Sequence, residues 1–303
     1  MSGKPDSPVF EPAPPLPDWL QAELPYRRRV LRSGEYGLHF IDDGQGPAAL
    51  LLHGNPTWSF LWRKVIRQLL AANVRVVAPD LIGLGLSDKP RDARVHTLGF
   101  HGGHIGTLVE ALGLDEVTLV GQDWGGPVLG LVAAQQRARV RGAVFANTAL
   151  GVPRRIRLSA FHRLANLPVV SDIFFRLLNL PVALMPMVQG DRASIGPTER
   201  RAYRYPLRAF RDRVAPLALA RMVPAGPEHP TIQSLAQVEQ WARSFAGPVR
   251  LVWGTRDPIL GAALRGARRL FPQADVIETS AGHFLQEEVP DTLTKAILSV
   301  VAA

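Results

Sequence analysis

The chain has 303 residues, of which 47% are hydrophobic and 20% charged, and its formal net charge is +9. This composition is typical of a globular protein with a large core, and the absence of cysteine excludes disulfides, a thiol nucleophile and a cysteine-ligated zinc site. No apolar run approaches the roughly 20 residues of a membrane span, and the proline-rich N-terminus lacks an apolar signal core. We therefore expect a cytoplasmic protein with an extended N-terminal arm over residues 1–25.

The first half of the chain alternates short apolar runs with helical patterns, joined by glycine-bearing segments. This alternation is typical of an α/β protein in which helices cover both faces of a mostly parallel sheet. The expected elements, in chain order, are strands at 38–42 and 48–52, a helix at 55–70, a strand at 74–78, a helix at 98–112, a strand at 117–120, a helix at 127–136 and a strand at 140–146.

The alternation stops at Val152, and from there to Gly226 prolines punctuate short helical patterns without any strand pattern. It resumes with elements expected at 231–245 (helix), 249–253 (strand), 262–270 (helix), 275–279 (strand) and 288–301 (helix). We therefore predict an all-helical cap over residues 152–226. The cap is inserted into a single core that spans residues 1–151 and 227–303.

The predicted cap carries the whole net charge of the chain. It contains thirteen arginines, no lysine and four acidic residues, whereas the remainder is balanced, with 22 basic and 22 acidic residues. A basic segment can attract anions, an acidic membrane surface or nucleic acid. Because no nucleic-acid motif accompanies the arginines, we expect a solvated helical face and no nucleic-acid partner.

Residues 121–125, GQDWG, place an acidic side chain between a predicted strand and a predicted helix. Their spacing is that of a nucleophile elbow, a sharp turn that exposes its central residue above the sheet. The N–H groups at the start of the next helix favour an anion there. The pattern indicates a carboxylate nucleophile at Asp123, and the alternative is that Asp123 only caps the helix.

Three further segments follow predicted strands. Residues 53–56, HGNP, are suited to aim backbone N–H groups at an oxyanion or to form an ordinary turn. Asp257 is suited to orient a histidine or to cap the next segment, and His283 follows the last strand. The chain order nucleophile, acid, histidine is that of α/β-hydrolases. Because functional residues of such sheets gather at the carboxyl ends of the strands, we expect these segments to converge.

Four segments in this order, HGNPTWSFLWR, PDLIGLGLSDKP, VGQDWGGP and AGHFLQEEVP, resemble the haloalkane dehalogenases of the α/β-hydrolase superfamily. The resemblance extends over almost the whole chain, the cap included. It implies that Asp123 is the nucleophile, His283 the base and Asp257 its acid partner. It also implies that Asn55 and Trp124 bind the halide and that their backbone N–H groups form the oxyanion hole.

Members of that family differ in the position of the acid partner. Some carry it after the strand that precedes the cap, where this chain has Asn147, so Asp257 is the better candidate. The resemblance implies hydrolysis of an alkyl halide to alcohol, halide and proton through an aspartyl ester. The partners are then a small halogenated hydrocarbon, water and a halide ion. We expect no cofactor and no metal site, because no metal-ligand spacing such as HExxH is present.

Three other functions compete with this interpretation. Epoxide hydrolases resemble the chain but use two cap tyrosines, and Tyr203 and Tyr205 lie two residues apart, on different faces of a helix. Fluoroacetate dehalogenases also resemble it but carry arginine after the nucleophile, where this chain has Trp124. A non-catalytic binding protein of the same fold is the third alternative, and the complete set of nucleophile, acid and base argues against it.

Overall fold

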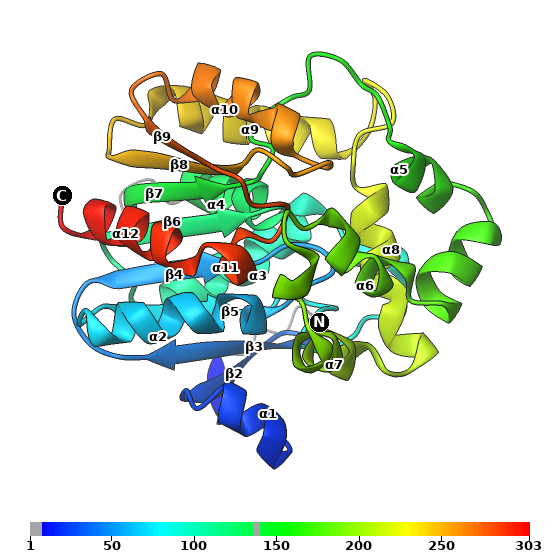
Figure 1. Ribbon diagram of the computed structural model, residues 1–303, viewed down its shortest axis with the longest axis horizontal. Helices are drawn as coiled ribbons and strands as arrows, with labels where there is room; N and C mark the ends of the chain where they lie inside the picture. The colour runs from blue at the N-terminus through cyan, green and yellow to red at the C-terminus, as the bar shows by residue number, and fades with distance from the viewer. Residues whose placement is uncertain (1–7, 136–139) are drawn as a thin grey trace, which may run out of the picture.

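The computed structural model describes residues 8–135 and 140–303, and its strands form one nine-stranded sheet (Figure 1). The strand order across the sheet is β1-β2-β3-β5-β4-β6-β7-β8-β9. The strands are β1 (Val9–Pro12), β2 (Arg28–Ser33), β3 (Tyr36–Asp43), β4 (Ala48–Leu52), β5 (Arg75–Pro79), β6 (Val117–Gln122), β7 (Val140–Ala146), β8 (Val249–Gly254) and β9 (Asp275–Thr279).

Helices connect these strands, and most of them lie on the two faces of the sheet or within residues 152–226. Outside residues 152–226 the α-helices are α1 (Asp18–Glu23), α2 (Arg63–Ala71), α3 (Leu98–Ala111), α4 (Gly125–Gln135), α9 (Thr231–Ser244), α10 (Leu264–Leu270), α11 (Leu285–Glu288) and α12 (Pro290–Val301). Within residues 152–226 they are α5 (Ala160–Ala165), α6 (Leu180–Ala183), α7 (Pro197–Arg204) and α8 (Val214–Arg221).

The sheet is mostly parallel, as the alternation predicted. Strands β5, β4, β6, β7, β8 and β9 run parallel to one another. At one edge β1, β2 and β3 pair antiparallel in turn, and β3 pairs antiparallel with β5. In the centre, Leu50 of β4 is paired with Val77 on one side and Leu119 on the other. The carboxyl ends of β4, β6 and β8 therefore open onto the same edge of the sheet.

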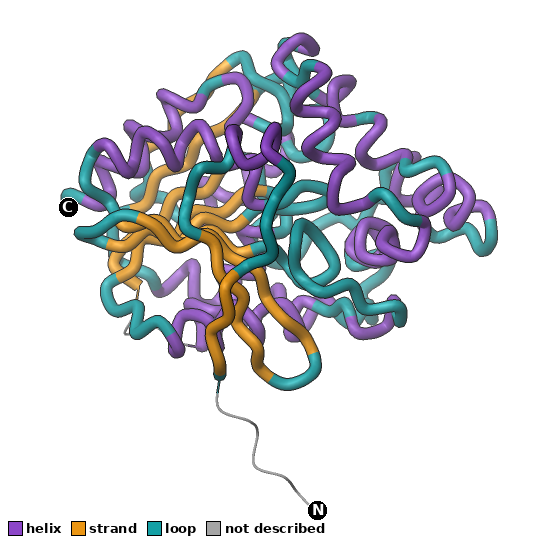
Figure 2. Tube along the Cα trace, turned by 90° about the horizontal axis from the view of Figure 1, so that it is seen from below, coloured by secondary structure: helices purple, strands orange, loops and turns teal. Residues whose placement is uncertain are grey.

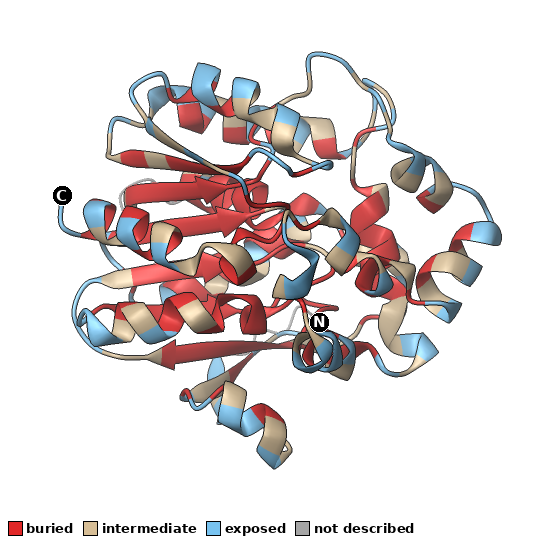
Figure 3. Cartoon of the chain, viewed as in Figure 1, coloured by how far each residue is buried: buried red, intermediate tan, exposed pale blue. Residues whose placement is uncertain are grey.

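Helices lie on both sides of the sheet (Figure 2), and its central strands are buried (Figure 3). Alternate residues of β4 point to opposite faces, so that Leu50 and Leu52 pack in one core with α3, α4 and α9. Ala49 and Leu51 pack in the other core with α2 and α12. Because strands buried on both faces need apolar side chains at every position, these strands are continuous apolar runs in the sequence.

The strands predicted at 48–52 and 140–146 coincide with β4 and β7. The helix predicted from residue 55 starts later, at a short 3₁₀ turn (Ser59–Trp62) followed by α2. The reason is that Asn55 precedes proline, which disfavours helical backbone. The last residue of the helix predicted at 127–136 lies outside the described residues.

The prediction of an extended arm over residues 1–25 is wrong where the structure describes it. Strand β1 pairs with β2, and α1 forms a helix that starts after Pro17. Leu20 and Leu24 are fully buried in the core beside α2. The free energy gained by burying these two leucines explains why this segment folds against the core. Two apolar residues alone make no helical periodicity, so the sequence did not predict the helix.

Between β7 and β8 the chain forms helical turns and no strand within residues 152–226. Figure 1 shows α5 to α8 beyond the carboxyl ends of the central strands. The boundaries 152 and 226 stay a prediction. Within the described part of the chain, no helix combines the length and apolarity that a membrane crossing requires.

Candidate active site

The turn from β6 to α4 holds Asp123 in a left-handed backbone conformation, with φ of 51°. Its backbone N–H donates to the carbonyl of Asn147, 3.0 Å away, and its side chain is 15% exposed. The turn requires glycine at position 125, because a Cβ there would overlap the carbonyl of Leu52. The structure therefore presents the Asp123 carboxylate at the end of a buried strand, as a nucleophile elbow does.

The segment after β4 contacts that carboxylate directly. The backbone N–H of Asn55 donates to Asp123 Oδ1 over 2.7 Å. Gly54 permits this approach, because a Cβ at that position would overlap the Asp123 side chain. The Asn55 side chain donates through Nδ2 to the carbonyl of Pro216 in α8, 3.0 Å away. An amide nitrogen carries two hydrogens, so one N–H of Asn55 is left for a further acceptor.

His283 lies between two carboxylates. Its Nδ1 is 2.9 Å from Asp257 Oδ2, and its Nε2 is 3.8 Å from Asp123 Oδ2. The other oxygen of Asp257 accepts from the backbone N–H of Ile259 over 2.7 Å. The side chains of His283 and Asp257 are almost inaccessible to solvent, at 1% and 0%. These contacts fix the ring so that Nε2 faces the nucleophile.

The pKa of His283 is raised above its ordinary value of 6.5. Burial acts in the opposite direction, because it disfavours the charged ring. The negative charge of Asp257, its hydrogen bond to the ring and the charge of Asp123 together outweigh burial. The site therefore stabilises a protonated His283 after the ring has accepted a proton.

Gln122, the residue directly before Asp123, contacts His283, and the sequence pattern did not predict this contact. Its Nε2 donates to the carbonyl of His283 over 3.2 Å and lies 3.3 Å from His283 Nε2. Because Asp257 accepts the proton on Nδ1, Nε2 of the neutral ring is an acceptor for this amide. The signal in the sequence was its position at the end of β6, next to Asp123.

Asn147, which follows β7, forms hydrogen bonds to the segments at the ends of β8 and β9. Its Nδ2 donates to the carbonyl of Gly282 over 2.8 Å, and its Oδ1 accepts from the N–H of Gly254 over 2.9 Å. An ionised carboxylate at this position has no donor for Gly282. In this chain the position thus braces the segments that carry Asp257 and His283.

Trp124 follows the nucleophile, is 9% exposed and packs in the core that contains α4. Its role in halide binding stays a prediction. Within the described ranges, no group of three or more histidine and carboxylate side chains is arranged to hold a metal ion. The residues that the structure brings together are Asp123, Asn55, Asp257 and His283. Their arrangement provides a carboxylate, a fixed N–H donor and an imidazole oriented by an acid, which suits nucleophilic displacement followed by hydrolysis.

Comparison with known proteins agrees with this geometry. Residues 47–290 match the family model described as the alpha/beta hydrolase fold, which places the chain among the α/β hydrolases. Haloalkane dehalogenase 2 of Mycobacterium tuberculosis is 34% identical over 292 residues, which cover 95% of this chain and 97% of that protein. The crystal structure of haloalkane dehalogenase DbeA from Bradyrhizobium elkani superposes with a TM-score of 0.82 and 26% identity, covering 91% of this chain and 97% of that one.

A third relative carries a different name: the cis-3-alkyl-4-alkyloxetan-2-one decarboxylase of Shewanella oneidensis is 29% identical over 278 residues, covering 90% of this chain and 87% of that protein. Haloalkane dehalogenase 2 is more similar in sequence to this chain than the decarboxylase is, and the match covers more of both chains. The chain belongs to the haloalkane dehalogenase family of the α/β hydrolases. It is a hydrolase that acts on carbon–halide bonds.

Proposed function

We propose that this protein hydrolyses small halogenated hydrocarbons with Asp123 as nucleophile, His283 as general base and Asp257 as the acid that orients it. The observation that carries the proposal is the position of the Asp123 carboxylate. One of its oxygens accepts the Asn55 backbone N–H at 2.7 Å, and the other faces His283 Nε2 at 3.8 Å.

In the first step, Asp123 Oδ2 attacks the halogen-bearing carbon, since Oδ1 is held by Asn55. A carbon–oxygen bond forms, the carbon–halogen bond breaks, and the halide leaves with the electron pair. An ionised carboxylate needs no base for this displacement. The free N–H of the Asn55 side chain and the Trp124 indole are the proposed halide donors. Each such charge-assisted hydrogen bond contributes about 1.5–3 kcal/mol.

In the second step, His283 Nε2 removes a proton from water, and the resulting hydroxide attacks the carbonyl carbon of the Asp123 ester. The oxyanion forms where Asn55 donates its backbone N–H, so the donor is in place before the charge develops. The bond from that carbon to the alkoxy oxygen then breaks. The alcohol leaves with the proton from His283, and Asp123, left as the carboxylic acid, releases its proton to solvent and becomes a carboxylate again. The sum is alkyl halide and water giving alcohol, halide and a proton.

The structure offers little support for epoxide opening by the cap tyrosines. Tyr203 is fully buried, and its hydroxyl donates to Glu287 over 2.6 Å. Tyr205 packs edge-on against Trp19, with ring centroids 6.0 Å apart. Neither hydroxyl has a contact with Asp123 among the described residues.

The two-step scheme is tested by intact-mass spectrometry after incubation with 1-bromobutane. We expect His283→Phe to accumulate a butyl adduct and to release halide only once, because the ester forms but is not hydrolysed. Asp123→Ala is the matched control and is expected to form no adduct. An unmodified His283→Phe protein would contradict the proposed roles. Halide release from 1-bromobutane, measured beside opening of styrene oxide, separates dehalogenation from epoxide hydrolysis.

A further inference from the structure

Exposed large apolar side chains are concentrated on the segment between β7 and α9. Of the ten that the described residues contain, eight lie there and only Val9 and Ile259 lie elsewhere. Single exposed apolar residues are common on protein surfaces, but a concentration of them marks an interaction site. The eight are Leu167, Val169, Val170, Ile173, Leu177, Leu178, Met187 and Phe210.

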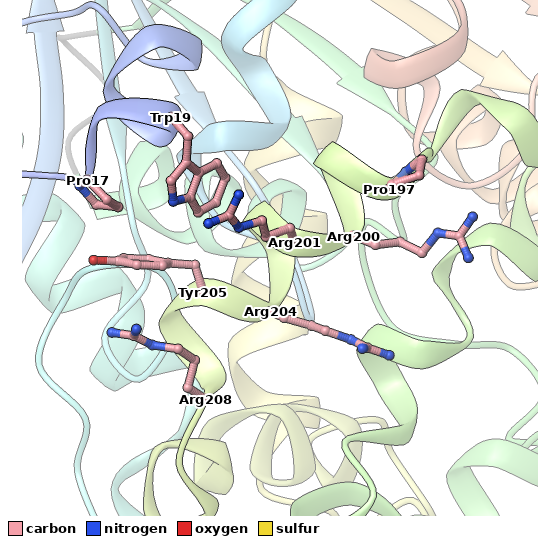
Figure 4. A pocket seen from close by; sticks show the side chains of 8 residues that line it. All are labelled: Pro17, Trp19, Pro197, Arg200, Arg201, Arg204, Tyr205 and Arg208. Atoms are coloured by element: carbon pink, nitrogen blue, oxygen red, sulfur yellow. The ribbon is translucent and has the colours of Figure 1, made fainter.

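In the same segment of the chain, arginines line a hollow of about 510 Å³ between α1 and α7 (Figure 4). Two of the guanidinium groups lie on aromatic rings: Arg201 is 3.9 Å from the ring centre of Trp19, and Arg208 is 4.4 Å from that of Tyr205. The described residues place no carboxylate within ion-pair distance of the arginines that line the hollow, which are Arg200, Arg201, Arg204 and Arg208.

A second hollow of about 350 Å³ adjoins the first, because Arg204 and Arg208 line both. Leu177 and Leu178, which are 60% and 57% exposed, form another part of its wall. Unpaired arginines and exposed leucines thus share one continuous surface, which we call the arginine–leucine surface. It comprises Trp19, Leu177, Leu178, Arg200, Arg201, Arg204, Tyr205 and Arg208, and neither hollow includes Asp123, Asp257 or His283.

We propose that the arginine–leucine surface docks on an anionic lipid bilayer. Basic side chains near such a bilayer are attracted by its surface potential, and adjacent apolar side chains gain by entering the interface. Arginine, tryptophan and tyrosine combine an apolar body with a polar tip, which suits the headgroup region. The apolar substrates of this enzyme dissolve in lipid, so docking brings the site close to where they collect.

Charge and exposure favour the bilayer over two other occupants. A free polyanion would use the arginines but leave Leu177 and Leu178 in water. A second copy of the chain in a two-fold contact would bring like charges together, because the segment 152–226 carries thirteen arginines against four acidic residues. An anionic bilayer complements both the charge and the apolar side chains.

The proposal is tested by co-sedimentation of the full chain with vesicles of phosphatidylcholine, alone or with about one third phosphatidylglycerol. We expect binding only to the anionic vesicles, and its loss in 1 M NaCl, where the screening length is about 3 Å. The variant R200Q/R204Q/R208Q should bind on the order of 100-fold more weakly, since each basic residue contributes separately. The variant L177S/L178S should also bind more weakly while keeping its charge.

The matched control is R91Q/R265Q/R269Q, which removes three exposed arginines from other surfaces. It should retain binding, and every variant should keep its rate of halide release from 1-bromobutane. The proposal is overturned if the control loses as much binding as the first variant, or if neutral vesicles bind equally. It is also overturned if inorganic polyphosphate or RNA binds and anionic vesicles do not, or if light scattering shows that the substitutions instead dissociate an oligomer.

Discussion

Two buried charge clusters in this molecule have opposite designs. In the first, Glu287 is enclosed: its carboxylate accepts from Arg63 at 2.6 and 3.0 Å and from Tyr203 at 2.6 Å, and it forms an ion pair with Lys64 at 2.9 Å. In the second, Asp123 Oδ2 accepts no hydrogen bond from the described residues; it lies 3.8 Å from His283 Nε2, and the Asp123 side chain is 15% exposed. A carboxylate whose acceptor capacity is filled holds structure together, whereas one with a free oxygen is available to react.

The pKa shifts follow the same division. Burial alone would lower the pKa of Arg63, but Glu287 and its hydrogen bonds raise it. The pKa of Tyr203 is raised well above 10, by burial and by Glu287. These groups keep their protonation states over the whole physiological range. His283 differs, because its pKa is raised against the opposing effect of burial by Asp257 and Asp123, and its ring must gain and lose a proton in the proposed reaction.

Two segments that carry the family resemblance lie far apart in the sequence, and the first cluster joins them. Arg63 belongs to HGNPTWSFLWR, and Glu287 belongs to AGHFLQEEVP. Their ion pair links the start of α2 to α11, and Tyr203 joins α7 to the same carboxylate. The pair therefore braces the segments that carry Asn55 and His283.

Among the residues that support the nucleophile and the base, the largest effect on catalysis is expected from Asp257→Asn. An amide keeps the shape of the side chain but no longer stabilises the protonated ring, and the corresponding change in a serine protease lowers kcat by about 10⁴. We expect a fall in kcat of roughly 10³–10⁴ and accumulation of the alkyl ester in intact-mass spectra. Asp92→Asn, on the surface, is the control. A fall in kcat smaller than tenfold would mean that Asp257 has a structural role only and does not support His283 in catalysis.

The largest effect on stability is expected from Glu287→Ala, which leaves Arg63 buried without its partner. Removing one member of a buried ion pair typically costs about 3–5 kcal/mol, and urea unfolding measures this loss. Halide release per folded molecule should stay within a factor of about two, and exposed Glu228 changed to Ala is the control. The double variant Arg63→Met/Glu287→Leu should lose less, because no charge is stranded. If the single and the double variant lost the same stability, the cost would not come from a stranded charge, and the structural role given to the Glu287 cluster would be wrong.

A smaller effect on rate is expected from Gln122→Leu, which removes the donor beside His283 Nε2. That donor favours the neutral ring, so its loss raises the pKa of His283 and moves the acid limb of kcat to higher pH. We expect about a tenfold lower kcat, comparable to one hydrogen bond of roughly 1.4 kcal/mol. Gln240→Leu, on the exposed side of α9, is the control. If the acid limb of the kcat profile did not shift, Gln122 would have a packing role and no influence on the pKa of His283.

The smallest expected effect is a pH difference between the two steps. His283 must be neutral to accept a proton, so ester hydrolysis falls as pH drops through its raised pKa. In the ester, Asp123 is uncharged and no longer raises that pKa. The limb of ester hydrolysis, measured by single-turnover kinetics, should therefore lie below the His283 pKa of the free enzyme measured by NMR titration. A limb at or above that value would contradict the assignment.

Local patterns predicted much of the core. The run AALLL matches β4, and VRGAVFA matches β7, because strands buried on both faces need apolar residues throughout. Asp123, Asp257 and His283 each follow such a strand, and the parallel sheet brings those strand ends together. The short helix α1 was missed, because its stability comes from Leu20 packing against distant residues.

The amino-acid sequence by itself determined the parallel sheet, the elbow at Asp123 and the order of acid and histidine along the chain, since these depend on periodicity and spacing within short segments. Only the tertiary structure decided that Gln122 contacts His283, that Asn147 braces two loops, that Glu287 pairs with Arg63 and that arginines of the segment 152–226 line a hollow with exposed leucines. Each of these contacts joins residues whose separation in the chain carries no local signal, and the packing of helices against the sheet brings them within a few ångströms.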